Sequence, residues 1–291
     1  MAQPDPLRAQ LSVVRSTDRE MARILERTAK QLRALIMRQG SGIGGEVRAA
    51  QLRVTLGEIR KIQRTLWRTG VLGAVTDGVD SAVEAAENAV EALTRVAYNA
   101  LPEAVAQALV DGLRASALSG LKSDKARRIR ALSPRVYKLE ALHTGKIEDI
   151  IRTGLIGNLS ARELASDVYQ YVSPTTKGGA SYAAMRLART EINNAFHERQ
   201  RSGAERPGVR AAKWNLSGSH RVPDLCNKYA THGGKGEWKP NEIPDKPHPQ
   251  CFCYLTYVTM APKDFRRAMA RGDFNDEIDR RTRANIERLK K

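Results

Sequence analysis

Aromatic side chains are scarce in this chain of 291 residues. Phe, Trp and Tyr together make up 5% of the sequence, whereas hydrophobic residues as a whole reach 41%. A core built mainly from Ala, Leu, Val and Ile with few rings is typical of helices packed on helices. Charged residues make up 28%, and long stretches contain no glycine. We therefore predict a mainly α-helical protein.

Long apolar runs and a secretory signal are also lacking. No run of about 18 apolar residues, the length that spans a bilayer as a helix, occurs in the sequence. The N-terminus, MAQPDPLRAQ, carries no apolar core of signal-peptide length. Three cysteines are too few for a disulfide framework in a chain of this size. We expect a soluble protein made in a reducing cytoplasm, with no membrane partner.

Negative charge is in short supply. The chain has 49 Lys and Arg against 32 Asp and Glu, a formal net charge of +17. Such an excess attracts polyanions, although a basic surface with no particular partner is the alternative. The sequence has no RNP motif, no C2H2 finger and no stacking patch, so base-specific recognition is not expected. We expect non-specific contact with double-stranded DNA.

The stretch between positions 122 and 152 is strongly basic. The sequence Ser133-Pro134 interrupts this run, and because proline disrupts helices we predict a domain boundary in this region. A solvated helix face is the alternative interpretation of the charges. The candidate DNA contacts are Arg127, Arg128, Arg130 and Arg135.

Apolar residues at helical spacing predict long helices in the first 120 residues. The first helix has a seam at Leu7, Leu11, Val14, Met21, Leu25, Leu32 and Leu35. A glycine-rich turn at 40–45 separates it from a second helix with Leu52, Leu56, Ile59, Ile62 and Leu66. After Gly70, Gly73 and Gly78, a third helix is expected from about Val79, with the stripe Val79, Val83, Ala86, Val90, Leu93 and Ala97. Packing in a bundle explains these stripes better than a separate coiled-coil partner.

The pattern changes after residue 147. Ser160 and Glu163 form a capping box ahead of one helix, and a second helix is expected from about Ser181. Two β-prone segments, 213–216 and 254–258, enclose a long irregular connection. We predict a helical N-terminal region (1–146), a small α+β domain with a short β-hairpin-like unit (147–260) and a charged helical tail with few apolar anchors (261–291).

All three cysteines lie within 28 residues, and three of the five histidines lie among or beside them. Thiolates and imidazoles are the preferred ligands of Zn2+, and a long polar loop needs a cross-link to fold. We predict a structural zinc site with four protein ligands, which leaves no open position for catalysis. Buried thiols without a metal, or a disulfide, are the alternatives. The candidate ligands are Cys226, His248, Cys251, Cys253 and His220.

Catalytic motifs are not found. His197-Glu198 lacks the second histidine of H-E-x-x-H, and no G-x-S-x-G occurs. Glu191 follows Arg189 on a helix and is interpreted as an ion-pair partner rather than a general base. We therefore expect that this protein is not an enzyme. A zinc-dependent nuclease or an ADP-ribosyltransferase-like effector is the alternative.

The order of short motifs resembles the phage Mu F-like domain of minor head proteins. The resemblance covers about 147–258 and rests on 188–191, 193–195, 213–214, 217–220, 224–226 and 247–253, which include Arg189, Glu191, Trp214 and Asp224 as motif residues. The usual pattern has a basic residue between the last two cysteines, where this chain has Phe252. That departure leaves the fold expectation intact but weakens any role assigned to this side chain.

The resemblance implies a minor capsid protein of a tailed phage, inside the head at the portal, that assists head assembly and DNA packaging or delivery. It implies the portal protein and the major capsid or scaffolding protein as partners, with the host cytoplasm as the site of assembly. It implies no catalytic residue. The helical N-terminal region lies outside the resemblance and is a candidate portal-binding part by its position alone.

Overall fold

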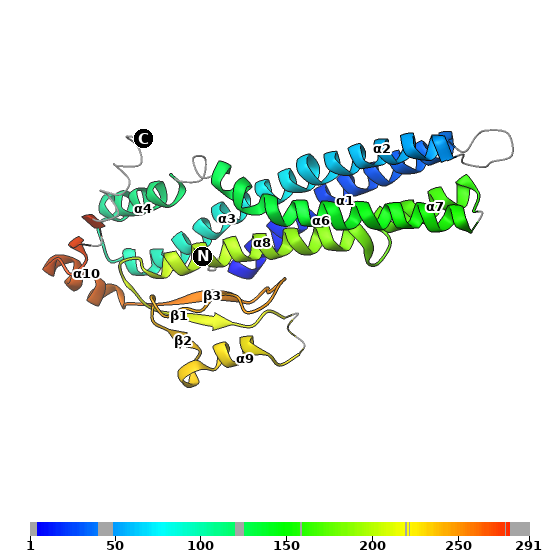
Figure 1. Ribbon diagram of the computed structural model, residues 1–291. Coiled ribbons are helices and arrows are strands. Elements are labelled where there is room, and N and C mark those ends of the chain that lie inside the picture. Colours follow the sequence, from blue (N-terminus) through cyan, green and yellow to red (C-terminus); the bar gives the residue numbers. More distant parts are fainter. Residues whose placement is uncertain are drawn as a thin grey trace. The chain divides into compact units, whose positions relative to one another are not determined.

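The computed structural model describes residues 5–39, 49–119, 125–157, 159–218, 220, 222–276 and 278–279, without the side chains of residues 49–53. The predicted glycine-rich turn and the Leu52 side chain lie outside this description. The α-helices are α1 (Pro6–Gln39), α2 (Ala49–Thr65), α3 (Leu72–Tyr98), α4 (Glu103–Leu118), α6 (Lys125–Ile156), α7 (Ala161–Val172), α8 (Gly179–Ala204), α9 (Leu225–Ala230) and α10 (Pro262–Arg271) (Figure 1). A π-helix spans Leu66–Val71, and a 3-10 turn spans His232–Gly234.

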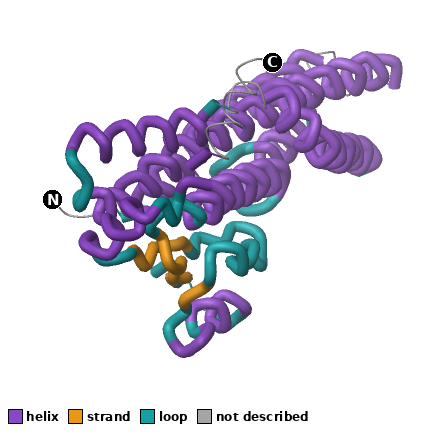
Figure 2. Tube along the Cα trace, turned by 90° about the vertical axis from the view of Figure 1, so that its left-hand side faces the viewer, coloured by secondary structure: helices purple, strands orange, loops and turns teal. Residues whose placement is uncertain are grey.

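Three strands near the C-terminus form an antiparallel sheet in the order β2-β1-β3. They are β1 (Val209–Asn215), β2 (Glu237–Trp238) and β3 (Tyr254–Thr259), shown side by side in Figure 2. Trp214 of β1 pairs with Leu255 of β3, and Ala212 pairs with Trp238 of β2. The predicted fold class, mainly α with a small α+β part near the C-terminus, is confirmed. Strand β3 contains the predicted segment 254–258, and β1 covers residues 213–215 of the predicted segment 213–216 but begins earlier, at Val209. Strand β2 is too short to show an alternation.

The chain forms two compact units, each assembled from separate segments. The sheet unit comprises Met1–Val14, Gly78–Lys125 and Arg189–Lys291, and the all-helical unit comprises Arg15–Asp77 and Ala126–Ala188. These units differ from the consecutive regions predicted at 1–146, 147–260 and 261–291. The reason is that α1, α3 and α8 are long enough to contribute residues to both units. In the described part of the chain, no helix is both long and apolar enough to cross a membrane.

The helices of the all-helical unit bury the predicted apolar seams. Met21, Leu25 and Leu32 of α1 are fully buried. The expectation that glycines separate the second and third helices is wrong: Gly70 lies in the π-helix and Gly73 in α3. Helix continues through them because packing of the buried neighbours outweighs the low helix propensity of glycine, about 1 kcal/mol per residue.

Pro134 lies inside α6 rather than at a domain boundary. Leu132 and Val136 on either side of it are buried, so the packed face holds the helix together across the proline. A proline inside a helix costs about 3 kcal/mol, which the apolar contacts of a helix of this length offset. The expected break at Ser133-Pro134 is therefore wrong.

Three apolar clusters hold the sheet unit together. One joins α3 to α8 through Ala86, Ile192 and Phe196, with small residues that allow the helices to approach closely. A second surrounds Phe265 of α10, which is fully buried, so the expectation of a tail with few anchors misses this contact. The third lies under the sheet and contains all three cysteines; its buried members are Ala204, Ala212, Trp214, Cys226, Ile243, Cys251, Cys253 and Leu255.

Candidate metal centre

The short helix α9 places Cys226 in its first turn. Asp224 is the N-cap: its Oδ1 accepts a hydrogen bond from the backbone N–H of Cys226 at 2.6 Å, and Asn227 Oδ1 accepts one from the backbone N–H of Asp224 at 2.9 Å. This reciprocal capping satisfies donors that a helix N-terminus leaves free. The Cys226 side chain is consequently fixed against the sheet and is fully buried.

The second arm of the centre is the segment 246–253, which is anchored to α8. The backbone N–H of Gln250 donates to Thr190 Oγ1 at 3.3 Å, and Arg189 Nη1 lies 3.5 Å from Gln250 Oε1. Gln250 has a φ of 57°, a left-handed conformation that reverses the chain just before Cys251. The turn directs Cys251 and Cys253 into the apolar cluster under the sheet, where both are buried.

The three thiols converge on one another, and one of them, Cys226, also lies beside a histidine. Cys226 Sγ lies 3.5 Å from Cys251 Sγ and 3.5 Å from His248 Nε2, and the three sulfur atoms lie within 4.8 Å of one another. Ligand atoms around a tetrahedral Zn2+ with Zn–S of about 2.3 Å and Zn–N of about 2.0 Å are separated by roughly 3.5–3.8 Å. The spacing therefore fits a metal ion. All three cysteines are free, so the disulfide alternative is not formed.

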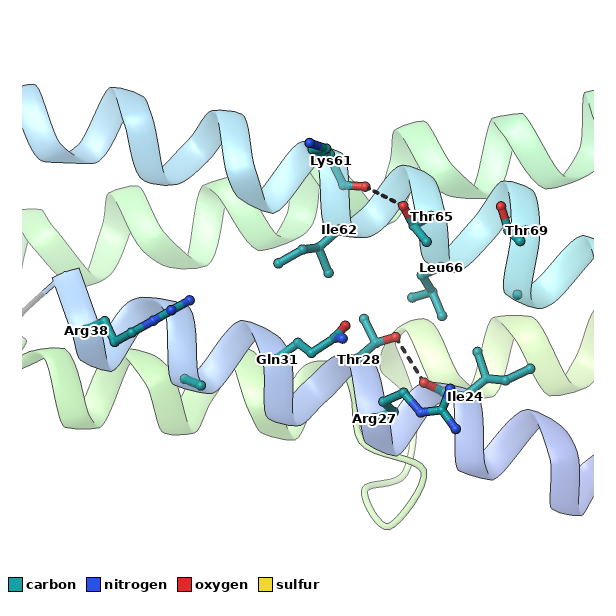
Figure 3. Close-up of a pocket in the computed structure, with 12 residues that line it drawn as sticks. Ile24, Arg27, Thr28, Gln31, Arg38, Lys61, Ile62, Thr65, Leu66 and Thr69 are labelled. Atoms are coloured by element: carbon teal, nitrogen blue, oxygen red, sulfur yellow. Dashed lines mark hydrogen bonds between the residues drawn. The ribbon is translucent and has the colours of Figure 1, made fainter.

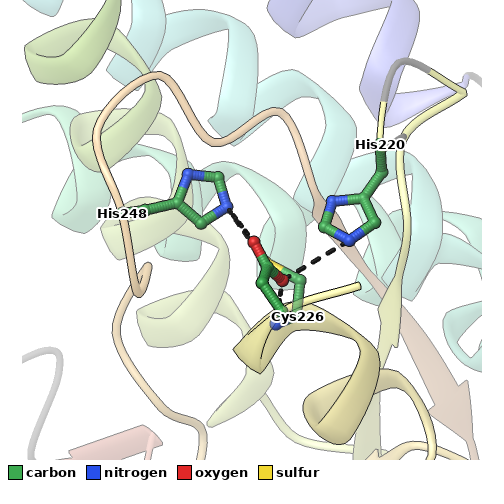
Figure 4. A group of neighbouring side chains, drawn as sticks. His220, Cys226 and His248 are labelled. Carbon is green, nitrogen blue, oxygen red and sulfur yellow. Dashed lines mark hydrogen bonds and ion pairs between the residues drawn. The ribbon is translucent and has the colours of Figure 1, made fainter. Parts of the chain in front are cut away.

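Cys226 also belongs to a second group of possible ligands, together with His220, Asp224 and His248 (Figure 4). The carboxylate of Asp224 lies between two rings, with Oδ2 at 3.1 Å from His248 Nε2 and Oδ1 at 3.4 Å from His220 Nε2. The ligand atoms of His220, Asp224, Cys226 and His248 all lie within 4.8 Å of one another. The structure thus brings together all five predicted ligands around Cys226 and adds Asp224. Asp224 was expected only as a motif residue. Its position two residues before Cys226 already indicated a possible metal ligand.

Hydrogen bonds among the thiols divide their protons unequally. The pKa of Cys253 is well below its usual range, because Cys226 and Cys251 donate to it and favour its thiolate form. The same hydrogen bonding, chiefly with Cys251, raises the pKa of Cys226. A thiolate is the form that binds metal, so this hydrogen bonding favours the charge that a metal ligand at Cys253 requires.

Lys246 lies beside the thiols and supplies the opposite charge. Its Nζ donates to the carbonyl oxygens of Cys251 and Cys253 at 2.7 and 2.6 Å. Burial lowers the pKa of Lys246 to about 8, so most of the side chain is protonated at neutral pH. Three thiolates and one divalent ion sum to a charge of minus one, which a single buried ammonium balances. This balance matters because an uncompensated charge in an apolar cluster is costly.

Aromatic rings cover the centre on the sheet side. Trp214 of β1 is 1% exposed and meets Tyr229 of α9 edge to face, with ring centroids 5.1 Å apart. Phe252, between the two cysteines, packs against the cluster of Ile192 and Phe196. An apolar side chain therefore suits this position, where the resemblance leads one to expect a basic residue. His232 stacks on Trp238 at 3.7 Å and belongs to neither donor group.

The predicted DNA contacts lie on α6 of the all-helical unit. Arg127, Arg130 and Arg135 are exposed, whereas Arg128 is half-buried. Trp214 lies in the cysteine cluster, and Arg189 contacts the Gln250 turn.

Comparisons of the chain with family models, with curated proteins and with solved structures found no match.

Proposed function

We propose that this chain is a minor capsid protein of a tailed phage, of the Mu F-like head morphogenesis family, whose C-terminal sheet is held by a structural Zn2+. The observation that carries the proposal is that Cys226 lies between two donors of the other arm: its sulfur is 3.5 Å from Cys251 Sγ, within the group of three thiols, and 3.5 Å from His248 Nε2. Two distant arms of a loop-rich segment, 226 and 248–253, are joined at this one point.

The ligand set that we favour is three thiolates and the His248 imidazole. The three sulfurs form one donor group, and His248 Nε2 is 3.5 Å from the sulfur of Cys226. The other ring nitrogen of His248, Nδ1, lies 3.0 Å from the Pro249 carbonyl, the kind of contact that orients a metal-bound histidine. Asp224 and His220 belong to the second donor group, where the Asp224 carboxylate faces the same Nε2 of His248. The loop between the sheet strands has few core residues of its own, so metal binding contributes directly to its folding.

A complete set of four protein ligands favours a structural role. Catalytic zinc keeps one position for water or substrate, whereas structural sites are closed and rich in cysteine. Burial of the three sulfurs agrees with this assignment. The protein accordingly acts through assembly and binding, and we propose no catalytic residue.

The contact between two family motifs supports the phage assignment. The motif at 188–191 lies on α8, and the motif at 247–253 follows about 60 residues later, yet Thr190 and Arg189 both contact Gln250. Motifs that recur in a fixed order are expected to meet in the fold if they define one domain. Trp214 and Asp224, from two further motifs, lie at the same centre.

In this proposal the protein lies inside the capsid near the portal, after assembly in the host cytoplasm. Its partners are the portal protein, the major capsid or scaffolding protein and double-stranded DNA. The DNA contact is non-specific and electrostatic, in keeping with the net charge of +17. The exposed arginines of α6 are the candidate contacts, and the N-terminal helices are the candidate portal-binding part.

Mass spectrometry of purified virions, together with co-purification with a portal ring, tests this function. We expect the chain in mature or precursor heads at a few copies per portal. Its absence from both would contradict the assembly role. Cleavage of DNA that is lost on metal chelation and restored by Zn2+ would instead support the nuclease alternative, and transfer of ADP-ribose to a protein would support the effector alternative.

A further inference from the structure

A groove of about 800 Å3 lies between α1 and the pair formed by α2 and the π-helix, within the all-helical unit (Figure 3). Its apolar lining comes from both sides: Ile24 belongs to α1, Ile62 to α2 and Leu66 to the π-helix. Ile62 and Leu66 extend from their helices toward α1 in Figure 3. The groove is open to solvent, and Ile24 and Ile62 are partly exposed in it, whereas Leu66 is buried at 2% exposure.

All the charges that line the groove are positive. Arg27 and Arg38 of α1 and Lys61 of α2 belong to the lining, which includes no Asp or Glu. The three cations are exposed. Among the described residues, no acidic side chain forms an ion pair with Arg27 or Lys61, in contrast to Arg60 of α2 and Arg68 of the π-helix, which pair with Glu148 and Glu140. An acidic ligand would complement this lining.

The length of the groove favours an elongated ligand. Along α1 the lining runs from Ile24 to Arg38, which at 1.5 Å per residue is about 21 Å. Along the other side it runs from Lys61 to Gly70, about 14 Å. A helix of three to four turns matches this length, and its apolar face can lie on the partly exposed Ile24 and Ile62, as in other helix-in-groove complexes.

The π-helix and Gly70 close one end of the groove. A Cβ added at Gly70 would lie 2.8 Å from Ile24 Cγ2, so only glycine lets α1 approach the π-helix this closely. A π-helical turn is uncommon and is often found at functional sites. Here it carries Leu66 and Thr69 into the lining. The shape is therefore built by specific residues at the point where the two sides meet.

We propose that this groove binds an acidic amphipathic α-helix of a partner protein. Duplex DNA has no apolar surface to cover Ile24 and Ile62, and a flat bilayer surface does not match a groove between two helices. An amphipathic helix satisfies both features, since its apolar face covers the lining while carboxylates on its flanks meet Arg27, Arg38 and Lys61. This binding site is separate from the metal centre and does not depend on the proposed phage role.

The probe for the test is a fluorescein-labelled peptide of about 18 residues, roughly 27 Å as a helix. Leucines occupy one face, glutamates flank that face, and a twin peptide has lysine in place of each glutamate. Fluorescence anisotropy with the full-length protein measures binding. We expect the glutamate peptide to bind and the lysine twin to bind at least about tenfold more weakly.

Two pairs of variants locate the binding. Arg27→Glu with Lys61→Glu should weaken binding of the glutamate peptide by about tenfold. The matched control, Arg19→Glu with Arg64→Glu, makes the same change in net charge at exposed positions of α1 and α2 that do not line the groove, and should change it by less than about twofold. Ala34→Trp, at an exposed lining residue, should block the groove while circular dichroism reports an unchanged helix content.

Several outcomes would overturn the proposal. They are no binding of the glutamate peptide at millimolar concentration, equal binding of both peptides, or equal losses in the two double variants. Vesicles of anionic phospholipid, or a DNA duplex, that bind more tightly than the peptide and lose affinity in Arg27→Glu with Lys61→Glu would assign the groove to that ligand instead.

Discussion

The Glu87 carboxylate forms an ion pair with the Arg206 guanidinium, and both side chains are fully buried. Arg199 donates to the other carboxylate oxygen at 2.8 Å and is itself 11% exposed. Glu87 lies in α3, Arg199 in α8 and Arg206 just before β1. One carboxylate therefore joins two helices of the sheet unit to the beginning of the sheet. Because two guanidiniums face one carboxylate, the cluster depends on that single negative charge.

Replacing Glu87 by glutamine should strongly destabilise the sheet unit. The substitution leaves two buried guanidiniums without a counter-charge, which should lower the free energy of unfolding by about 4 kcal/mol. Urea denaturation measures the loss. The control is Glu91→Gln, since Glu91 is partly exposed in its pair with Arg114 and should lose less than about 1 kcal/mol. Similar losses in the two variants would refute the central role of Glu87.

Two glycine-to-alanine substitutions should change stability in opposite directions. A Cβ at Gly203 of α8 would lie 2.6 Å from both methyl groups of Val90 on α3, so Gly203→Ala should cost about 1–3 kcal/mol. At Gly57, in the interior of α2, an added Cβ would meet no atom within 4 Å apart from its own chain neighbours and the nearby helix backbone. Gly57→Ala should therefore raise the free energy of unfolding by about 0.5–1 kcal/mol through helix propensity. Thermal unfolding checks both, and a stabilised Gly203→Ala would show that α3 and α8 pack less closely than described.

His197 should make the protein less stable in acid. The side chain is 2% exposed, its Nε2 donates to the Pro244 carbonyl at 2.8 Å, and burial lowers the pKa of His197 to about 3. The unfolded chain has a histidine pKa of about 6.5 and so binds a proton that the folded chain does not. The free energy of unfolding therefore keeps its full value above about pH 6.5. Below that pH, His197 lowers it by about 1.4 kcal/mol per pH unit as the pH drops toward 3.

The comparison of wild type with His197→Phe isolates this effect. Urea denaturation at pH 6.5 and pH 5 should show a decrease about 2 kcal/mol larger in wild type, because 1.5 pH units, at about 1.4 kcal/mol each, act only where the histidine is present. Phenylalanine keeps a ring beside Trp214, which His197 meets edge to face at 5.1 Å. Equal pH dependence in the two proteins, or a His197 ring that titrates near pH 6.5 by NMR, would contradict the assignment.

Binding to DNA should weaken steeply with salt. Replacing Arg127, Arg128, Arg130 and Arg135 of α6 by glutamine should lower the affinity for duplex DNA and reduce the slope of log affinity against log salt by about 0.9 for each lost phosphate contact. A matched control replaces the exposed arginines Arg8, Arg15, Arg19 and Arg64. Equal slopes in the two variants would rule out α6 as the main DNA contact. Sequence-selective binding would contradict the non-specific character of the contact.

Much of the fold could be predicted from local patterns in the sequence. The capping box of Ser160 and Glu163 is formed, because the side-chain and backbone donors of an N-terminus are satisfied within four residues. Met21, Leu25, Leu32 and Leu35 of α1 are buried, because their helical spacing places them on one face of the helix. The cysteines and histidines cluster as predicted, since their crowding in the sequence already limited the distance between them.

The features that sequence analysis missed depend on contacts between distant segments. Gly70 and Pro134 disfavour helix locally, and only their packing partners keep them helical. The pairing of Glu87 with Arg206 joins residues 119 positions apart, and no periodicity indicates it. The groove beside Ile24 likewise depends on how α1 and the π-helix approach one another.

The zinc content of the purified chain tests the central claim most directly. We predict about one Zn2+ per chain in wild type, lost in Cys226→Ser together with the ordered signals of the sheet unit, and retained in His232→Ala, because His232 lies outside both donor groups. Removal of the metal by a chelator should melt the same sheet unit. A wild-type protein without zinc, or a Cys226→Ser variant that keeps stoichiometric zinc, would contradict the account.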